Sequence, residues 1–288
     1  MAIDQRIIDL YDEFTHAPLD RRVFMERLAA LTGSTAAAMA IAPMLGPNYA
    51  AAAVVSADDS RLESKMITIK GVNGDIKADQ VKPKGAGKLG AVIVIHENRG
   101  LNPHIEDVAR RIALEGFVAV APDLLSPLGG TPNDPDAARD LFPKLDLNQN
   151  TQNLVAMVQV LEKSPETNGK VGAVGFCWGG AAVNQLAVHS PSLKAAVPYY
   201  GRQPSAEDTA KIQAPIMAHY GALDKGINAG IPGFEEALKK NNKKYTLYTY
   251  EGANHAFNNE TGADRYHKPS ADLAWTRTIG FLKDNLKG

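Results

Sequence analysis

Three continuous apolar runs constrain the fold of this chain more than any other feature. They are AVIVI (91–95), FVAVAPDL (117–124) and KVGAVGF (170–176), and each has the composition of a strand buried on both faces. A helix is predicted between the first two runs at residues 103–115, with Asn102 as its cap. Strands that alternate with helices indicate a mostly parallel central sheet with helices on both faces.

The same alternation continues to the end of the chain. Before the first run, an antiparallel hairpin is predicted around the turn at Asn73-Gly74. Residues 126–148, with four prolines and two adjacent glycines, predict a long excursion of the kind that often covers a substrate pocket. The later elements are predicted helices at 178–189, 233–241 and 270–286 and predicted strands at 195–201, 214–221 and 245–252.

The stretch VGAVGFCWGG (171–180) joins the third run to a helix through a short turn. Cys177 lies there between Gly175 and Gly179, which is the G-x-S-x-G nucleophile elbow with sulfur in place of oxygen. Unpaired N–H groups and the dipole at the helix N-terminus favour a thiolate and later an oxyanion. We therefore predict an α/β-hydrolase fold with Cys177 as nucleophile; the alternative is an inert, buried cysteine.

The partners of such a nucleophile follow it in the order acid, then histidine, each in a loop after a strand. Asp224 follows APIMAHYG, and His255 follows the next predicted strand. We expect His255 to move the thiol proton and Asp224 to fix the imidazole tautomer. The alternatives are that Asp224 is an ordinary turn residue and that another histidine, such as His219, is simply a core residue.

The loop IHENRGLNP (95–103) follows the first buried strand and supplies an oxyanion N–H in this fold. We predict that the backbone N–H groups of Asn98 and Trp178 form the oxyanion hole. Glu97 would lie beside the nucleophile, where a carboxylate repels developing negative charge. Glu97 is therefore a candidate catalytic residue with an unusual place in the site.

Charge and cysteine content exclude several function classes. The chain of 288 residues has 31 basic and 32 acidic residues, so we expect neither nucleic-acid binding nor a polybasic membrane surface. Its single cysteine excludes an intramolecular disulfide and a zinc site built on several thiolates. We expect no cofactor and no metal.

Residues 1–57 differ from the catalytic domain predicted at 58–288. Arg21-Arg22, a weakly apolar segment and later small residues resemble a twin-arginine export signal, although Asp20 precedes the pair. We predict a periplasmic protein on this basis. The alternative is a helical extension packed on the domain of a cytoplasmic protein. Pro43 interrupts a stretch that is already short, so a stable membrane anchor is not expected.

Several motifs together resemble one family. HENRG, the G-x-C-x-G-G elbow, PYYG, the H-Y-G-x-x-D loop and GANHAF are similar to the dienelactone hydrolase (carboxymethylenebutenolidase) family over residues 60–288. The resemblance implies one α/β-hydrolase domain and lactone hydrolysis by a Cys–His–Asp triad through a covalent thioester. It also implies that Glu97 holds the resting thiol neutral and swings away when substrate binds.

One departure from that family concerns the substrate. Members acting on dienelactone hold its carboxylate with arginines, one of them just after the catalytic histidine, whereas this chain has Asn258 and Asn259 there. Arg139 in the long excursion is a candidate replacement. The departure favours a neutral ester or lactone, with an apolar pocket formed from Trp178, Tyr199, Tyr200, Phe257 and Tyr266.

The leading hypothesis is a hydrolase for a small-molecule ester or lactone. A carboxylesterase or thioesterase is the alternative, since a triad specifies acyl transfer but not the acyl group. A non-catalytic ligand-binding homologue is the alternative from another class. A thiol redox protein is disfavoured because no second cysteine could resolve a disulfide. The sequence does not predict the oligomeric state.

Overall fold

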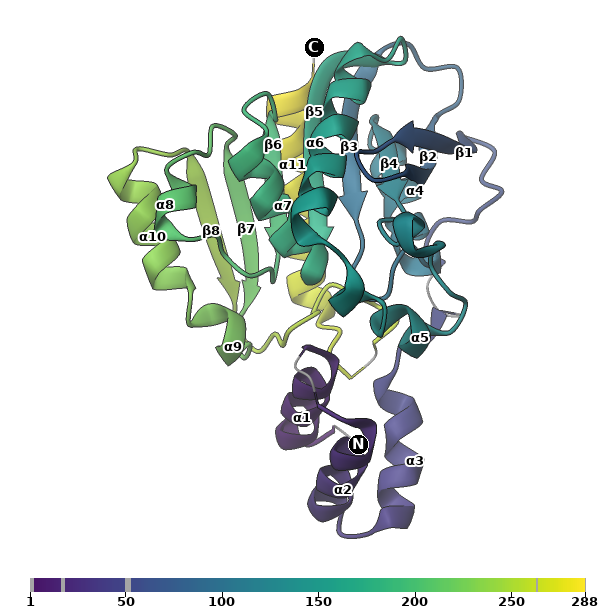
Figure 1. Ribbon diagram of the computed structural model, residues 1–288, viewed down its shortest axis with the longest axis vertical. Helices are drawn as coiled ribbons and strands as arrows, with labels where there is room; N and C mark the ends of the chain where they lie inside the picture. Colours follow the sequence, from purple (N-terminus) through teal and green to yellow (C-terminus); the bar gives the residue numbers. More distant parts are fainter. Residues whose placement is uncertain (1–2, 17–18, 50–52, 263, 288) are drawn as a thin grey trace.

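The computed structural model describes residues 3–16, 19–49, 53–262 and 264–287, and it confirms the predicted α/β fold. Its eight-stranded sheet has the order β1-β2-β4-β3-β5-β6-β7-β8 (Figure 1). The strands are β1 (Leu62–Lys70), β2 (Asp75–Pro83), β3 (Leu89–Ile95), β4 (Val118–Pro122), β5 (Thr167–Phe176), β6 (Ala195–Tyr199), β7 (Ile216–Gly221) and β8 (Tyr245–Tyr250). The helices are α1 (Gln5–His16), α2 (Arg21–Thr32), α3 (Thr35–Leu45), α4 (Pro103–Leu114), α5 (Pro135–Arg139), α6 (Leu147–Lys163), α7 (Trp178–His189), α8 (Ala206–Thr209), α9 (Lys225–Asn228), α10 (Ile231–Lys240) and α11 (Lys268–Leu286).

The sheet is parallel except at β2, which pairs antiparallel with both β1 and β4. β3 shows why the apolar runs lack alternation. Ala91, Ile93 and Ile95 pack into the core under α6, α7 and α10, whereas Val92 and Val94 pack into the core under α4 and α11. Both faces of the strand are therefore buried. The carboxyl ends of the parallel strands meet at one edge, and a site assembled from their loops must lie there.

The excursion after β4 contains more structure than the sequence predicted. It folds into two 3₁₀ turns (Ser126–Leu128 and Phe142–Lys144) and the short helix α5, and α6 already begins at Leu147. The prolines cause this, because each of these short elements has a proline in its first turn, where the missing N–H is not needed.

The N-terminal segment forms the three helices α1–α3, which lie beyond the carboxyl edge of the sheet (Figure 1). They share a small apolar core of Ile7, Leu10, Tyr11, Phe14, Phe24, Leu28, Ala38 and Leu45. Asp20 caps α2 by accepting a hydrogen bond from the Arg22 N–H, and Arg21 forms an ion pair with Asp136 of α5 at 3.1 Å. The residue that departs from the export pattern thus has a structural role as a helix cap.

In the described part of the chain, no single helix has the length and apolar character needed to cross a membrane. The helices α2 and α3 taken together have this length and apolar character, but the chain bends by 113° between them.

Candidate active site

The nucleophile elbow is present at the junction of β5 and α7. Cys177 has φ 56° and ψ −113°, a strained conformation for a residue with a side chain. A Cβ at position 175 would lie 2.8 Å from Val183 Cγ2 and closer still to the Gly179 carbonyl. A Cβ at position 179 would clash with the carbonyls of Ile95 and His96 at the end of β3. The close approach of strand and helix at Cys177 therefore requires glycine at both positions.

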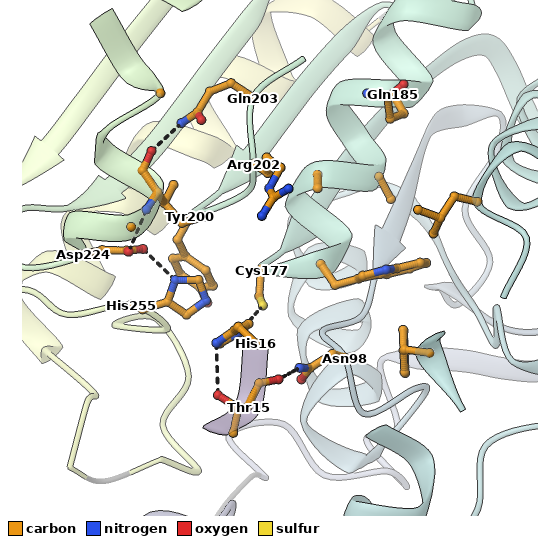
Figure 2. A pocket seen from close by; sticks show the side chains of 18 of the residues that line it. Thr15, His16, Asn98, Cys177, Gln185, Tyr200, Arg202, Gln203, Asp224 and His255 are labelled. Carbon is orange, nitrogen blue, oxygen red and sulfur yellow. Dashed lines mark hydrogen bonds and ion pairs between the residues drawn. The ribbon is translucent and has the colours of Figure 1, made fainter. Parts of the chain in front are cut away.

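Asp224 and His255 meet as the triad prediction requires (Figure 2). His255 Nδ1 lies 2.6 Å from Asp224 Oδ2, and both side chains are buried. Asp224 Oδ1 accepts a hydrogen bond from the Ile227 N–H as the cap of α9, which fixes the carboxylate. Within the described residues His255 Nε2 has no hydrogen-bond partner. The unpartnered nitrogen is the one that a proton-transfer role requires.

The charges around His255 favour its imidazolium form. Burial on its own would lower the pKa of His255, but the carboxylates of Asp12 and Asp224 outweigh burial and raise it. One of these carboxylates comes from β7–α9 and the other from α1. The electrostatics of the site thus include the N-terminal segment.

The hydrogen-bond partner of the thiol was not predicted. His16 Nε2, at the end of α1, lies 2.9 Å from Cys177 Sγ (Figure 2). The rings of His16 and His255 are 4.5 Å apart between centroids in an edge-to-face arrangement. The only signal in the sequence was an Asp12–His16 pair at i,i+4 spacing near the end of an amphipathic helix, and nothing in that pattern indicates contact with residue 177.

The position of Glu97 corrects one expectation. Its Oε2 accepts a hydrogen bond from Asn259 Nδ2 at 2.8 Å, and its Oε1 is buried with no partner among the described residues. Glu97 shares a small pocket with Cys177, but it is His16 that hydrogen-bonds the thiol. The carboxylate is held away from the thiol because Asn259, one of the two asparagines that follow the catalytic histidine, donates a hydrogen bond to it.

Both residues predicted to supply the oxyanion N–H groups line the cavity together with Cys177. Trp178 is the first residue of α7, and N–H groups in the first turn of a helix lack partners within that helix. The side chain of Asn98 donates to the Thr15 carbonyl of α1 at 2.7 Å, which anchors the loop after β3. The oxyanion role of both backbone N–H groups stays a prediction.

A cavity of about 1250 Å³ opens beside the triad. Its wall includes Trp178 and Tyr200 as predicted. Tyr199 and Phe257 are instead fully buried core residues outside this wall, and Tyr199 hydrogen-bonds Thr278 of α11 at 2.7 Å. Tyr266 is half-buried and also lies outside this wall. These three pocket predictions were wrong, and the rings of Tyr199 and Phe257 pack against each other in the core.

Two arginines line the same cavity. Arg139 is engaged already, since its guanidinium lies 4.5 Å above the Phe14 ring and pairs with Asp140 at 3.0 Å. Arg202 follows β6 and was not predicted; its side chain points towards the Cys177 side of the cavity (Figure 2). Of the two, Arg202 is the more exposed and the better placed to meet a polar group of a substrate.

Two sets of side chains among the described residues have the spacing of metal ligands. They are His16, Cys177 and His255, and Asp12, Asp224 and His255, each with ligand atoms within 4.8 Å of one another. A tetrahedral zinc ion would hold nitrogen and sulfur ligands roughly 3.5 Å apart, given bonds of about 2.0 and 2.3 Å. The 2.9 Å between His16 Nε2 and Cys177 Sγ favours a direct hydrogen bond.

Comparison with known proteins identifies the family. Residues 76–286 match the model of the dienelactone hydrolase family, and residues 1–33 match a model described as YqhI-like. The chain belongs to the dienelactone hydrolase family. It is therefore a hydrolase, and the resemblance seen in its motifs is confirmed.

Relatives of this dienelactone hydrolase family member cover most of its length. A "Putative carboxymethylenebutenolidase" of Escherichia coli (strain K12) is 31% identical over 250 residues, which span 81% of this chain and 91% of the relative. A relative from Saccharolobus solfataricus with the same description is 34% identical, over 67% of this chain and 88% of the relative. The crystal structure of a "Putative Dienelactone Hydrolase" from Klebsiella pneumoniae superposes with a TM-score of 0.69 at 29% identity, covering 77% of this chain and 98% of that one.

Proposed function

We propose that this family member hydrolyses a carboxylic ester or lactone through Cys177, His255 and Asp224. The observation that carries the proposal is the convergence of three elements on one cavity wall. The elbow presents Cys177, and the buried His255–Asp224 pair lies beside it with Nε2 of the imidazole unpartnered among the described residues. A strained nucleophile and an oriented base are the parts that covalent acyl transfer needs.

The reaction follows from these parts. Cys177 Sγ gives up its proton and attacks the acyl carbon, the bond to the leaving oxygen breaks, and that oxygen takes up the proton and departs as the alcohol, leaving a thioester. Water then attacks the thioester carbon while His255 takes its proton, the bond to sulfur breaks, and His255 returns the proton to the sulfur. Asp224 holds Nδ1 protonated and stabilises the imidazolium. The N–H groups of Trp178 and Asn98 are the proposed donors to the oxyanion in both steps.

The surroundings of the cavity support a neutral or weakly polar substrate. Asn258 and Asn259 follow the histidine, and Asn259 is occupied with Glu97. Trp178, Tyr200 and Phe142 supply aromatic surface, and Arg202 adds an exposed cation. A small ester or lactone with one polar end fits this lining better than the anionic dienelactone does.

A panel of aryl esters, lactones and acyl thioesters, run with wild type and Cys177→Ala, tests the proposal. We expect the variant to lose turnover by a factor of at least about 10³, as is typical when a nucleophile is removed. His189→Asn, at an exposed site on the far end of α7, is the control and should retain wild-type rates. Unchanged activity in Cys177→Ala would contradict the triad. Ligand-induced thermal stabilisation without turnover in wild type would favour a binding protein.

A further inference from the structure

The contact between α1 and the nucleophile supplies the starting observation. His16 Nε2 lies 2.9 Å from Cys177 Sγ. Its other nitrogen, Nδ1, faces three oxygens: the Asp12 carbonyl at 2.9 Å, Thr15 Oγ1 at 3.0 Å and the Asp12 carboxylate at 3.2 Å. With its proton committed to this side, the neutral ring presents Nε2 to the thiol as an acceptor.

The Asp12–His16 pair has the same carboxylate–imidazole arrangement as the pair in the triad. Asp224 orients His255 from the catalytic domain, and Asp12 orients His16 from α1, four residues away on the same helix. Both imidazoles face Cys177, but only His16 is within hydrogen-bond distance of the sulfur among the described residues. The resting proton acceptor of the thiol is therefore on the N-terminal segment.

The charges that face His16 favour the imidazolium that forms when it takes the thiol proton. Burial lowers its pKa and His255 opposes a second positive charge, but the Cys177 thiolate and Asp12 outweigh both and raise the pKa to about 10. Asp12 remains ionised, since His255, His16 and Arg265 pull its pKa well below the usual range against the effect of burial. His16 is also the last residue of α1, where the helix dipole stabilises a cation.

Several contacts hold α1 in this position. Asn98 donates to the Thr15 carbonyl at 2.7 Å, and the Arg99 guanidinium donates to the Tyr11 hydroxyl at 3.0 Å. Gln5, at the other end of the helix, donates to the side chain of Asn254 at 2.6 Å. The helix is thus tied to the loop after β3 and to the residue before His255, the two loops that form the site.

The cavity remains continuous with the nucleophile while α1 is in place. Cys177 and His255 line it together with Asp12, Thr15 and His16. The helix therefore forms one wall of the reaction chamber and leaves the sulfur in contact with the cavity. Substrate can therefore reach the sulfur with α1 in place, so α1 does not have to move away before substrate binds.

We propose that His16 and Asp12 form a second acid–base pair that deprotonates Cys177 and protonates the leaving group. The thiol proton passes to His16 Nε2, and Sγ bonds to the acyl carbon. When the bond from that carbon to the leaving oxygen breaks, His16 returns the proton to it and the alcohol departs. Water then loses a proton to His255 as it attacks the thioester, and His255 passes this proton to the departing sulfur. Each imidazole ends neutral.

The inference rests on the proposed function for its reaction, but its first test needs no substrate. Because Cys177 is the chain's single cysteine, iodoacetamide alkylation, followed by mass spectrometry with EDTA present, reports its thiolate alone. We expect His16→Asn to slow alkylation at pH 6 roughly tenfold or more, since the sulfur loses the one imidazole within hydrogen-bond distance among the described residues and a cationic neighbour favours the reactive thiolate. Asp12→Asn should produce a smaller slowing, and the exposed His189→Asn should produce none.

Burst kinetics with an aryl ester separate the two imidazoles. His16→Asn should slow the burst, which reports thioester formation, whereas His255→Asn should keep a burst and slow the steady state. Circular dichroism and the melting temperature establish that each variant is folded. An alkylation profile and burst in His16→Asn identical to wild type would overturn the second pair while leaving Cys177 hydrolysis intact. Persistent turnover in Cys177→Ala would instead overturn the proposed function, whatever the alkylation profile shows.

Discussion

Substitution of Gly179 by alanine tests whether the elbow requires the close approach of β3 and α7. Gly179 is in the first turn of α7, and a Cβ there would lie 2.8 Å from the Ile95 carbonyl carbon and closer still to the oxygens of Ile95 and His96. These atoms belong to the backbone at the end of β3, so no side-chain rotation can relieve the clash. Over-packing of this kind costs about 1–3 kcal/mol.

Gly280 in α11 offers a matched control. It is exposed, and a Cβ there would meet no atom within 4 Å. Both glycines are helical, so alanine gains roughly 1 kcal/mol of intrinsic helix propensity at each. Gly280→Ala should therefore be more stable than wild type by up to about 1 kcal/mol. Gly179→Ala should be less stable than wild type by up to about 2 kcal/mol, which is the cost of the clash minus the gain in helix propensity.

Thermal and urea unfolding measure the change in stability, and ester hydrolysis measures the change in activity. The melting temperatures of the two variants should differ by several degrees, because each kcal/mol corresponds to roughly 2–4 °C in a domain of similar size. Gly179→Ala should also lose activity, since the clash separates α7 from the loop that carries Asn98. If Gly179→Ala matches Gly280→Ala in both stability and activity, the close approach of strand and helix at Cys177 is not what the site requires.

Three further predictions concern other parts of the chain. Glu97→Gln should leave iodoacetamide alkylation of Cys177 unchanged, because the carboxylate is paired with Asn259; a large change would restore the gating role that the family resemblance implies. Glu166→Gln should lower the free energy of unfolding at pH 7 by about 1 kcal/mol, which is the contribution expected of a partly exposed ion pair. The hydrogen bond from Lys82 holds the pKa of Glu166 at about 2 instead of 4.5, so this contribution is present above pH 4.5 and is lost as the pH falls through about 2, which urea titrations across that range would detect. Intact mass of the purified protein and cell fractionation test the export prediction: a chain that retains α1 favours the packed extension, and loss of the first 57 or so residues favours a cleaved signal and removes His16.

The sequence predicted those features that depend on local pattern. The run AVIVI is a buried strand because both of its faces meet helices, and Asn102 caps α4 by accepting from two N–H groups. The elbow, Asp224 and His255 were predictable because chain order and strand position define them in this fold. In each case the contacts that determine the feature join residues close in sequence or follow from the topology of the sheet.

The features that were missed depend on contacts between distant segments. His16 reaches Cys177 across 161 positions, and the helical pattern of α1 contains no information about what its end contacts. Glu97 was expected on the thiol, but Asn259, from the loop after β8, holds it instead. Tyr199 is as aromatic as Tyr200, yet one ring faces Thr278 in the core and the other the cavity. Packing between elements decides each of these outcomes.

The most direct test of the central claim is to trap the acyl-enzyme. His255→Asn is mixed with an aryl ester, quenched in acid after one turnover, digested and sequenced by mass spectrometry. We predict that the peptide containing Cys177 carries the acyl group, as a thioester that neutral hydroxylamine removes. An acyl group on another residue, or turnover in wild type with no acylated Cys177 at any quench time, would contradict it.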